Sequence, residues 1–266
     1  MPTPLRSVSI TDAEGAQFTV GTLIGVDESG NEAAAGDGLC AVVAVRAART
    51  TEVDLVRALI QAGLQPFKYK SSSLGYEARL TDSERRDRVQ QFLTSIEPLP
   101  ITWTAVVCRG EYRDPIRAAA AVMAAKKTIT GGSSLEHTGD RAAILHDERV
   151  LNQSYKTPVC RKVAKEFDTG FQQAFHPVYP TFVNKADLTY PQSIAADFIG
   201  GYLRSRLLDG ATTDQLGESV LEFDDSWTHH PPSVKRLNRK PTATCGSGNE
   251  ERVTWTNSPR KQSVLS

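Results

Sequence analysis

The sequence lacks the features of a membrane, secreted or disulfide-stabilised protein. No stretch approaches 18 uninterrupted apolar residues, and the opening Met1-Pro2-Thr3-Pro4-Leu5-Arg6 has no apolar core of a signal peptide. The four cysteines are widely spaced and form no C-x-x-C pair, which indicates a reducing compartment and no structural zinc. We therefore expect a cytoplasmic protein that does not contact a membrane.

An excess of one charge is also absent. Lys and Arg together number 31, as do Asp and Glu, so the chain as a whole indicates no affinity for nucleic acid. Local patches matter more than the sum, so a polyanionic substrate is not excluded. No glycine-rich Walker or dinucleotide-binding motif is present, and Ser29 and Ser71 to Ser73 lack His and Asp partners that would indicate a serine nucleophile.

The chain is long enough for one large domain or two small ones, with 266 residues of which 39% are hydrophobic. Patterning divides it into an N-terminal hairpin or extension over 1–20, a globular domain over 21–223 and a flexible basic tail over 224–266. Apolar runs predict strands over 23–30, 38–45, 101–107, 141–148 and 178–184. Helical spacing predicts helices over 52–61, 111–128 and 158–167, one capped by Thr81 and Glu84, and one beginning at Pro191. Residues 67–74 read as a polar, basic loop.

Three of these strands end on acids: at Asp27 and Glu28, at Asp147, and at Asp187. Adjacent strand residues point to opposite faces, so only one of Asp27 and Glu28 can face a pocket directly unless Gly30 turns the chain. A further acid, Asp197, lies on or near the apolar face of its helix. It is either a costly buried charge or part of a site.

Carboxylates at strand ends can converge at one edge of an α/β sheet, where such sheets bind ligands. A divalent cation relieves their repulsion, and oxygen-only ligation favours Mg²⁺ or Mn²⁺ over zinc. Two such ions would support hydrolysis of a phosphodiester. His229-His230 is better explained as tail composition, since no third ligand has suitable spacing, and the strand position of His146 favours a structural role.

These residues resemble the type 2 ribonucleases H. The stretch from Ile24 to Gly30 is similar to their I-D-E-A-G strand, and Lys70-Ser71-Ser72-Ser73-Leu74 with Leu80 to Arg86 resembles D-S-K-K-L-T-x-x-x-R. Asn184-Lys185-Ala186-Asp187 resembles K-A-D, and Tyr190 to Ala196 resembles the S-A-A-S helix. The resemblance implies an α/β fold with a ribonuclease H-like mixed sheet flanked by helices over 21–223.

The same resemblance implies a catalytic D-E-D-D metal site made of Asp27, Glu28, Asp147 and Asp187, which cuts the RNA strand of RNA/DNA hybrids. The residues expected to contact substrate are Gly30, Asn31, Lys70, Ser71 and Lys185. Two family features are missing. The G-R-G that reads ribose is Gly30-Asn31-Glu32, and the lysine pair of S-K-K-L is Ser72-Ser73.

The chain also resembles an uncharacterised prokaryotic family that opens on I-D-E-S-G and ends on an A-D-x-I-A-G helix. In that interpretation Asp197 joins or replaces Asp187 as the last metal ligand. Two functions stay open: a nuclease dependent on Mg²⁺ or Mn²⁺ that acts on RNA/DNA hybrid or RNA, and a nucleic-acid-binding or regulatory protein with altered or lost catalysis. The second would use Lys68, Lys70, Arg161, Lys162 and the basic tail.

Overall fold

The structure is a computed structural model and describes most of the predicted globular domain. Its described residues are 8–11, 17–30, 38–110, 113–130, 142–147, 153–168, 178–228, 244–245 and 252–254. Within these ranges no helix combines the length and apolar character needed to cross a membrane.

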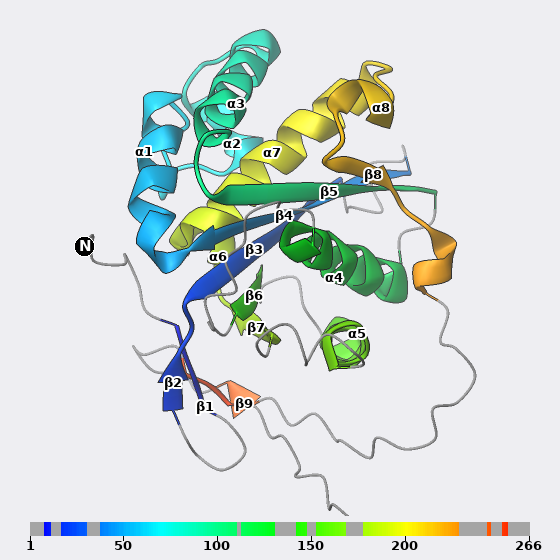
Figure 1. The fold of residues 1–266 in the computed structure, drawn as a ribbon. Helices are drawn as coiled ribbons and strands as arrows, with labels where there is room; N and C mark the ends of the chain where they lie inside the picture. The colour runs from blue at the N-terminus through cyan, green and yellow to red at the C-terminus, as the bar shows by residue number, and fades with distance from the viewer. Residues whose placement is uncertain are drawn as a thin grey trace, which may run out of the picture.

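A six-stranded mixed sheet forms the centre of the molecule, in the order β7-β6-β3-β4-β5-β8 (Figure 1). Strands β3, β4 and β5 pair antiparallel, whereas β6 and β7 continue the sheet in parallel from β3, and β8 runs parallel to β5. The strands are β3 (Thr22–Ser29), β4 (Leu39–Ala48), β5 (Ile101–Arg109), β6 (Ala142–Asp147), β7 (Val178–Val183) and β8 (Val220–Glu222). The expected α/β architecture with a mixed sheet flanked by helices is confirmed.

Helices cover both faces of this sheet. One face packs against α1, α3 and α7, and the other against α4 and α5 (Figure 1). The described helices are α1 (Glu52–Gln61), α2 (Ser71–Glu77), α3 (Asp82–Ile96), α4 (Asp114–Thr130), α5 (Gln153–Asp168), α6 (Ala186–Thr189), α7 (Pro191–Leu208) and α8 (Thr213–Leu216), with 3-10 turns η1 (Arg49–Thr51) and η4 (Asp225–Trp227).

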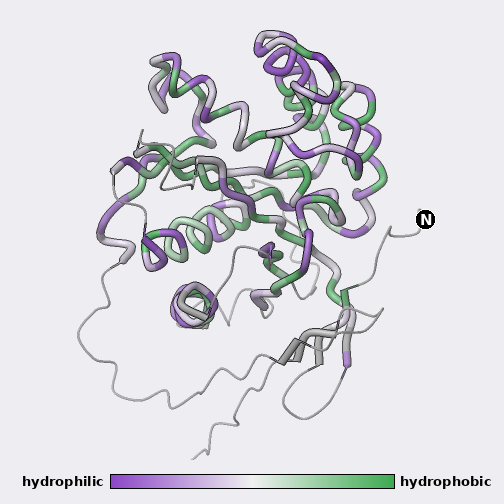
Figure 2. The backbone as a smooth tube through the Cα atoms, turned by 180° about the vertical axis from the view of Figure 1, so that it is seen from behind, coloured by the Kyte–Doolittle hydropathy of each residue, from purple (hydrophilic) through white to green (hydrophobic). Residues whose placement is uncertain are grey.

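The alternation of side chains along β4 produces two separate cores. Val43 and Val45 pack on the α7 side, whereas Val42 and Ala44 pack on the α4 side, and all four are fully buried. A strand buried on both faces needs a continuous apolar run, which is why β4 was recognisable in the sequence. Figure 2 shows hydrophobic residues along these central strands and hydrophilic residues on the outer turns of the helices.

Two helices differ from the sequence expectation. The segment predicted as a loop over 67–74 contains the start of α2, because burial of Leu74 in the core under α7 outweighs the weak helix propensity of three serines. Helix α5 begins at Gln153 rather than Pro158, so Pro158 lies inside it. Buried Tyr155 anchors this added first turn.

A second, small sheet joins segments from the two ends of the described chain. Strand β1 (Ser9–Thr11) pairs antiparallel with β2 (Gln17–Thr19), where the sequence predicts a hairpin. It also pairs parallel with β10 (Arg252–Thr254), which pairs with β9 (Thr244–Cys245). These last strands lie in the region predicted as a tail. The proposed division at residues 20 and 223 stays a prediction.

Candidate active site

The acids of β3 lie on the floor of a cavity of about 850 Å³ at the carboxyl end of that strand. Asp27 faces α7 and Glu28 faces α4 and α5, as strand alternation requires. Both nevertheless line the same cavity, because it extends around the end of the strand from α7 to α4 and α5. The two acids thus point to opposite faces of the strand, as the sequence predicts, and the exception that the sequence left open at the strand end, near Gly30, applies here.

A glycine in β3 brings α7 to the site. A Cβ atom at Gly25 would lie 2.1 Å from the backbone nitrogen of Ser193, so only glycine allows this approach. Asp27 follows Gly25 on the same strand face, and Asp197 follows Ser193 by one helical turn. The contact therefore sets Asp197 beside Asp27, close enough for the charge of Asp197 to raise the pKa of Asp27.

Burial opposes ionisation of both carboxyl groups, and the charge of Asp197 adds to this effect at Asp27. Burial, and next the charge of Asp197, raise the pKa of Asp27 well above its usual value. Burial raises the pKa of Asp197 to about 6, although a hydrogen bond from the backbone N–H of Ser71 to its Oδ2 at 2.6 Å favours the charged form. The floor of the cavity therefore disfavours two negative charges without a compensating cation.

Lys70 provides one such cation. Its ammonium forms an ion pair with Oδ2 of Asp187, whose side chain is only 4% exposed, and its charge also favours ionisation of Asp27 and Asp197. The other oxygen of Asp187, Oδ1, is buried and has no hydrogen-bond partner in the part of the chain that the structure describes. This carboxylate oxygen is thus removed from water without gaining a hydrogen bond in exchange.

The opposite wall of the cavity comes from α4 and α5. Arg117 places Nε 3.1 Å and Nη2 3.0 Å from Oε2 of Glu28, and Tyr155 forms a further hydrogen bond to Glu28. Burial raises the pKa of Glu28, and Arg117 opposes this rise. The arginine guanidinium also lies 4.8 Å from the centroid of the Tyr155 ring. Sequence analysis singled out neither residue, because neither belongs to a strand-end motif.

The remaining predicted acids line the same cavity. Asp147 accepts a hydrogen bond from the backbone N–H of Lys185 at 3.0 Å, so Lys185 contributes to the site through its backbone. All five predicted acids line the cavity, as do Gly30, Lys70 and Ser71. Asn31, Glu32 and His229-His230 lie outside the described residues.

The acids gather without forming a finished metal centre. Among the described residues, no three His, Cys, Asp or Glu side chains lie close enough together to hold an ion as they stand. Lys70 and Arg117 pair with two of the acids instead. The donor set itself fits a hard divalent cation, since it consists of carboxylate oxygens and includes the unpartnered Oδ1 of Asp187.

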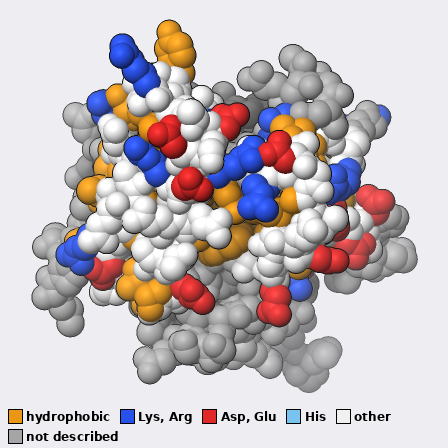
Figure 3. Space-filling view, turned by 90° about the horizontal axis from the view of Figure 1, so that it is seen from above, with side chains coloured by type: hydrophobic (Ala, Val, Ile, Leu, Met, Phe, Trp, Pro, Cys, Tyr) orange, Lys and Arg blue, Asp and Glu red, His pale blue; other side chains and the backbone are white. Residues whose placement is uncertain are grey.

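Two more arginines of the cavity each lie against a glycine. A Cβ at Gly30, where φ is +97°, would lie 2.4 Å from Nε of Arg204, and one at Gly75 would lie 2.9 Å from Cδ of Arg85. Both arginines line the cavity. Figure 3 shows basic and acidic side chains interspersed on the face seen from above, with basic ones gathered near its centre. The arginine of L-T-x-x-x-R was a sequence signal for Arg85, whereas Arg204 had none.

His146 also lines the cavity but is nearly fully buried, at 2% exposure. Its ring stacks on Phe182 at 5.4 Å between centroids, and its Nδ1 lies 3.4 Å from the Tyr155 hydroxyl. Burial lowers its pKa to about 3. A ring that stays neutral and packed between aromatic residues agrees with the structural role expected from the sequence.

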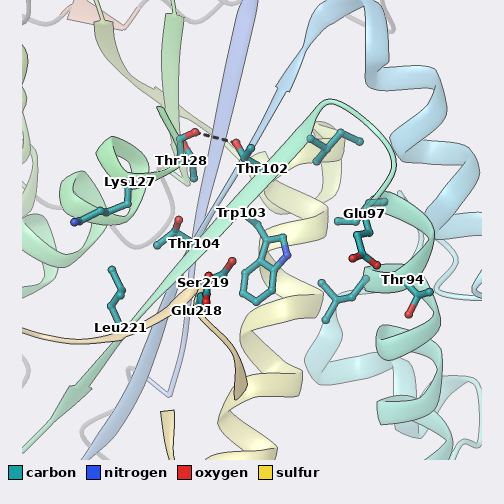
Figure 4. A pocket seen from close by; sticks show the side chains of 13 residues that line it. Thr94, Glu97, Thr102, Trp103, Thr104, Lys127, Thr128, Glu218, Ser219 and Leu221 are labelled. Carbon is teal, nitrogen blue, oxygen red and sulfur yellow. Dashed lines mark hydrogen bonds between the residues drawn. The ribbon is translucent and has the colours of Figure 1, made fainter. Parts of the chain in front are cut away.

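A second cavity, of about 650 Å³, lies at the opposite end of the sheet (Figure 4). It is lined by the first residues of β5, which runs in the same direction as β3, and by the ends of α3 and α4. Trp103 projects into it from β5, and Glu97 and Glu218 also line it (Figure 4). None of the predicted site residues lines this cavity, so the acidic cavity at the end of β3 is the candidate active site.

No protein-family model matches the chain, and no curated protein matches its sequence. Among solved structures, a variant of Bst ribonuclease HIII is similar at 17% identity over 71% of this chain and 54% of that chain, with a TM-score of 0.45. Bst ribonuclease HIII in complex with Mn²⁺ matches at 16% identity over 71% and 53%, with a TM-score of 0.41. The ribonuclease H2 from Pyrococcus horikoshii OT3 matches at 13% identity over 78% and 83%, with a TM-score of 0.42.

The chain thus spans about half the length of the ribonuclease HIII structures that it matches. These solved structures are ribonucleases H, the group that the strand-end motifs also resemble. The identities are 17% or lower and the TM-scores are below 0.5, so the chemistry of this chain has to be argued from the residues of its own cavity. What the comparisons return is a set of ribonuclease H structures.

Proposed function

We propose that the protein is a metal-dependent nuclease that hydrolyses phosphodiester bonds in nucleic acid. The observation that carries this proposal is the pair of neighbouring carboxyl groups, Asp27 and Asp197, that line one open cavity. Two neighbouring, partly buried carboxyl groups, one of which raises the pKa of the other, are costly in a protein that has no cation to bind there. Such pairs are typical of functional sites.

The residues that would hold the metal are the acids around this pair. Asp27, Glu28, Asp147, Asp187 and Asp197 all supply carboxylate oxygens to one cavity, and we assign Mg²⁺ or Mn²⁺ as the cation. When bound, such ions activate a water and stabilise the leaving oxygen of a phosphodiester. Asp197 joins Asp187 among these ligands because it lies beside Asp27, and Asp187 would exchange its ion pair with Lys70 for the metal.

The protein's own cations would bind and orient the substrate. Arg85, Arg117 and Arg204 line the cavity together with the acids. Guanidinium groups bind phosphate oxygens in a fixed geometry, so they can hold a nucleic-acid backbone across the carboxylates. This division, with acids on the floor and arginines on the walls, suits a phosphodiester better than a neutral ester.

The finer proposal is that the substrate is the RNA strand of an RNA/DNA hybrid. It rests on the order of the motifs that resemble type 2 ribonucleases H. This chain differs from those ribonucleases at two places that concern substrate recognition. Asn31-Glu32 replaces the R-G that reads ribose, and Ser72-Ser73 replaces two lysines. Selection of a ribonucleotide in this chain must therefore use other groups.

The test is hydrolysis of labelled RNA/DNA hybrid, duplex with one ribonucleotide, single strands and duplex DNA, each with Mg²⁺ and with Mn²⁺. We expect cleavage of the hybrid and a loss of at least about 100-fold in Asp27→Asn, since a metal contributes several kcal/mol to the transition state. Asp54→Asn is the matched control, because Asp54 pairs with Arg57 on the surface of α1. No cleavage of any substrate in either metal would overturn the proposal.

A second candidate is a nucleic-acid-binding protein without catalysis. The pairing of Lys70 and Arg117 with acids of the site favours it, since these cations satisfy part of the negative charge. The basic residues that sequence analysis assigned to this role need correction: Lys162 is buried, pairs with Glu166 and donates to the carbonyl of Trp227. This candidate predicts salt-sensitive binding of nucleic acid, no cleavage, and equal binding by Asp27→Asn.

A further inference from the structure

Lys70 reaches the acidic cavity from its open side. It is the extended residue that precedes α2, with φ −83° and ψ 160°, and its side chain is 33% exposed. The carboxylate that it contacts, Asp187, is 4% exposed. The ammonium therefore extends from solvent down to a buried acid, and Asp187 is its hydrogen-bond partner among the described residues.

The next residue fixes the backbone at this point. The N–H of Ser71 donates to Oδ2 of Asp197 at 2.6 Å, and a Cβ at Gly201 would lie 2.0 Å from the Ser71 hydroxyl oxygen. The backbone is thus tightly held against α7. The flexible four-carbon side chain of Lys70 is not held in this way, so its ammonium can leave the acids without any movement of the backbone.

We propose that Lys70 is a displaceable internal counter-ion, which neutralises the acids of the cavity in the metal-free protein and competes with the divalent cation for Asp187. This inference rests on the proposed function, since it concerns how the same site takes up its metal. The Lys70 ammonium carries one charge and lies against one oxygen of Asp187, while Oδ1 of the same carboxylate has no hydrogen-bond partner among the described residues. A divalent cation carries twice the charge of an ammonium and takes more oxygen ligands than the three N–H donors of an ammonium can contact.

Two consequences follow from competition. Metal binding must break the ion pair of Lys70 with Asp187, so part of the intrinsic metal affinity is lost in the native sequence. Replacing Lys70 by a neutral side chain of similar length removes this competitor and leaves a buried carboxylate that needs a cation. We expect Lys70→Met to bind Mn²⁺ about tenfold more tightly than the wild-type protein, a change of about 1.4 kcal/mol.

The experiment measures Mn²⁺ binding directly, by calorimetry or by the electron paramagnetic resonance signal of free Mn²⁺, without nucleic acid. Lys68→Met is the matched control, because Lys68 lies over the Tyr69 ring at 4.5 Å and does not line the cavity. Lys70→Arg keeps the charge and should bind Mn²⁺ within about twofold of the wild-type protein. Thermal unfolding supplies a second measurement. In chelator Lys70→Met should unfold at a lower temperature than the wild-type protein, and saturating Mn²⁺ should abolish this difference.

The outcomes separate this inference from the proposed function. Tighter Mn²⁺ binding by Lys70→Met alone supports the counter-ion role. If the wild-type protein binds Mn²⁺ and Lys70→Met binds it equally or more weakly, the counter-ion role is overturned and the metal-dependent function stands. If neither protein binds Mn²⁺, the metal-dependent function itself is overturned.

Discussion

Replacing Asp197 by asparagine should stabilise the metal-free protein at neutral pH. The pKa of Asp197 is raised from 3.8 to about 6 by burial. A carboxyl whose pKa is higher in the folded state than in the unfolded state lowers stability as pH rises from about 4 to about 6, and the loss remains above that range. Asparagine keeps an oxygen for the N–H of Ser71 but carries no charge.

The magnitude follows from the same pKa values. A rise from 3.8 to about 6 corresponds to about 3 kcal/mol at pH 7.5 and about 1 kcal/mol at pH 4.5. Because Asp197 lines an open cavity and is partly accessible to water, we expect a smaller gain of about 1–2 kcal/mol at pH 7.5. For a domain of this size that gain raises the melting temperature by about 2–8 °C.

The assay is thermal unfolding in chelator at pH 4.5 and pH 7.5. Asp209→Asn is the control, since Asp209 follows the same helix and forms an exposed ion pair with Arg86 worth less than about 1 kcal/mol. Mn²⁺ should then stabilise the wild-type protein more than Asp197→Asn. An Asp197→Asn protein that is less stable at pH 7.5, or whose gain is the same at both pH values, would refute the electrostatic account of this site.

Three further predictions test the parts of the fold that position the site. Gly25→Ala should destabilise the protein by at least about 3 kcal/mol in denaturant unfolding, because its Cβ would lie 2.1 Å from the backbone nitrogen of Ser193; a normal stability would contradict the close packing of α7 on β3. Thr81→Ala should cost about 1 kcal/mol by the same assay, since the capping box with Glu84 at the start of α3 is lost; an unchanged midpoint would argue against this cap. The ring signals of His146 should show no titration between pH 5 and 8 by NMR, because burial lowers its pKa to about 3; a titration near pH 6.5 would show that the ring is accessible.

Local signals in the sequence predicted much of the fold. The capping box of Thr81 and Glu84 marked the start of α3, and the apolar run over 38–45 marked β4, because both depend on neighbouring residues in the chain. Helix α2 was missed because three serines have no strong preference for helix. Its formation depends on burial of Leu74 against distant elements.

The same distinction applies to the site. Asp27 and Asp147 stood out because each ends an apolar strand, and both line the cavity. Arg117 and Tyr155 carried no such signal, since they come from separate helices and reach Glu28 only through the packing of α4 and α5 on the sheet. Sequence patterns thus identified the acids and Lys70, whereas the pairing of Arg117 with Glu28 depends on tertiary structure.

The claim that this cavity is a nuclease site is tested most directly by one measurement, the rate of cleavage of a labelled RNA/DNA hybrid in Mn²⁺ by the wild-type protein and by Asp27→Asn. Asp27 is the acid whose ionisation the site opposes most clearly and whose carboxyl group contacts Asp197. We predict cleavage by the wild-type protein and a rate at least about 100-fold lower in Asp27→Asn. Equal rates for the two proteins would contradict the account, because the activity would then come from elsewhere.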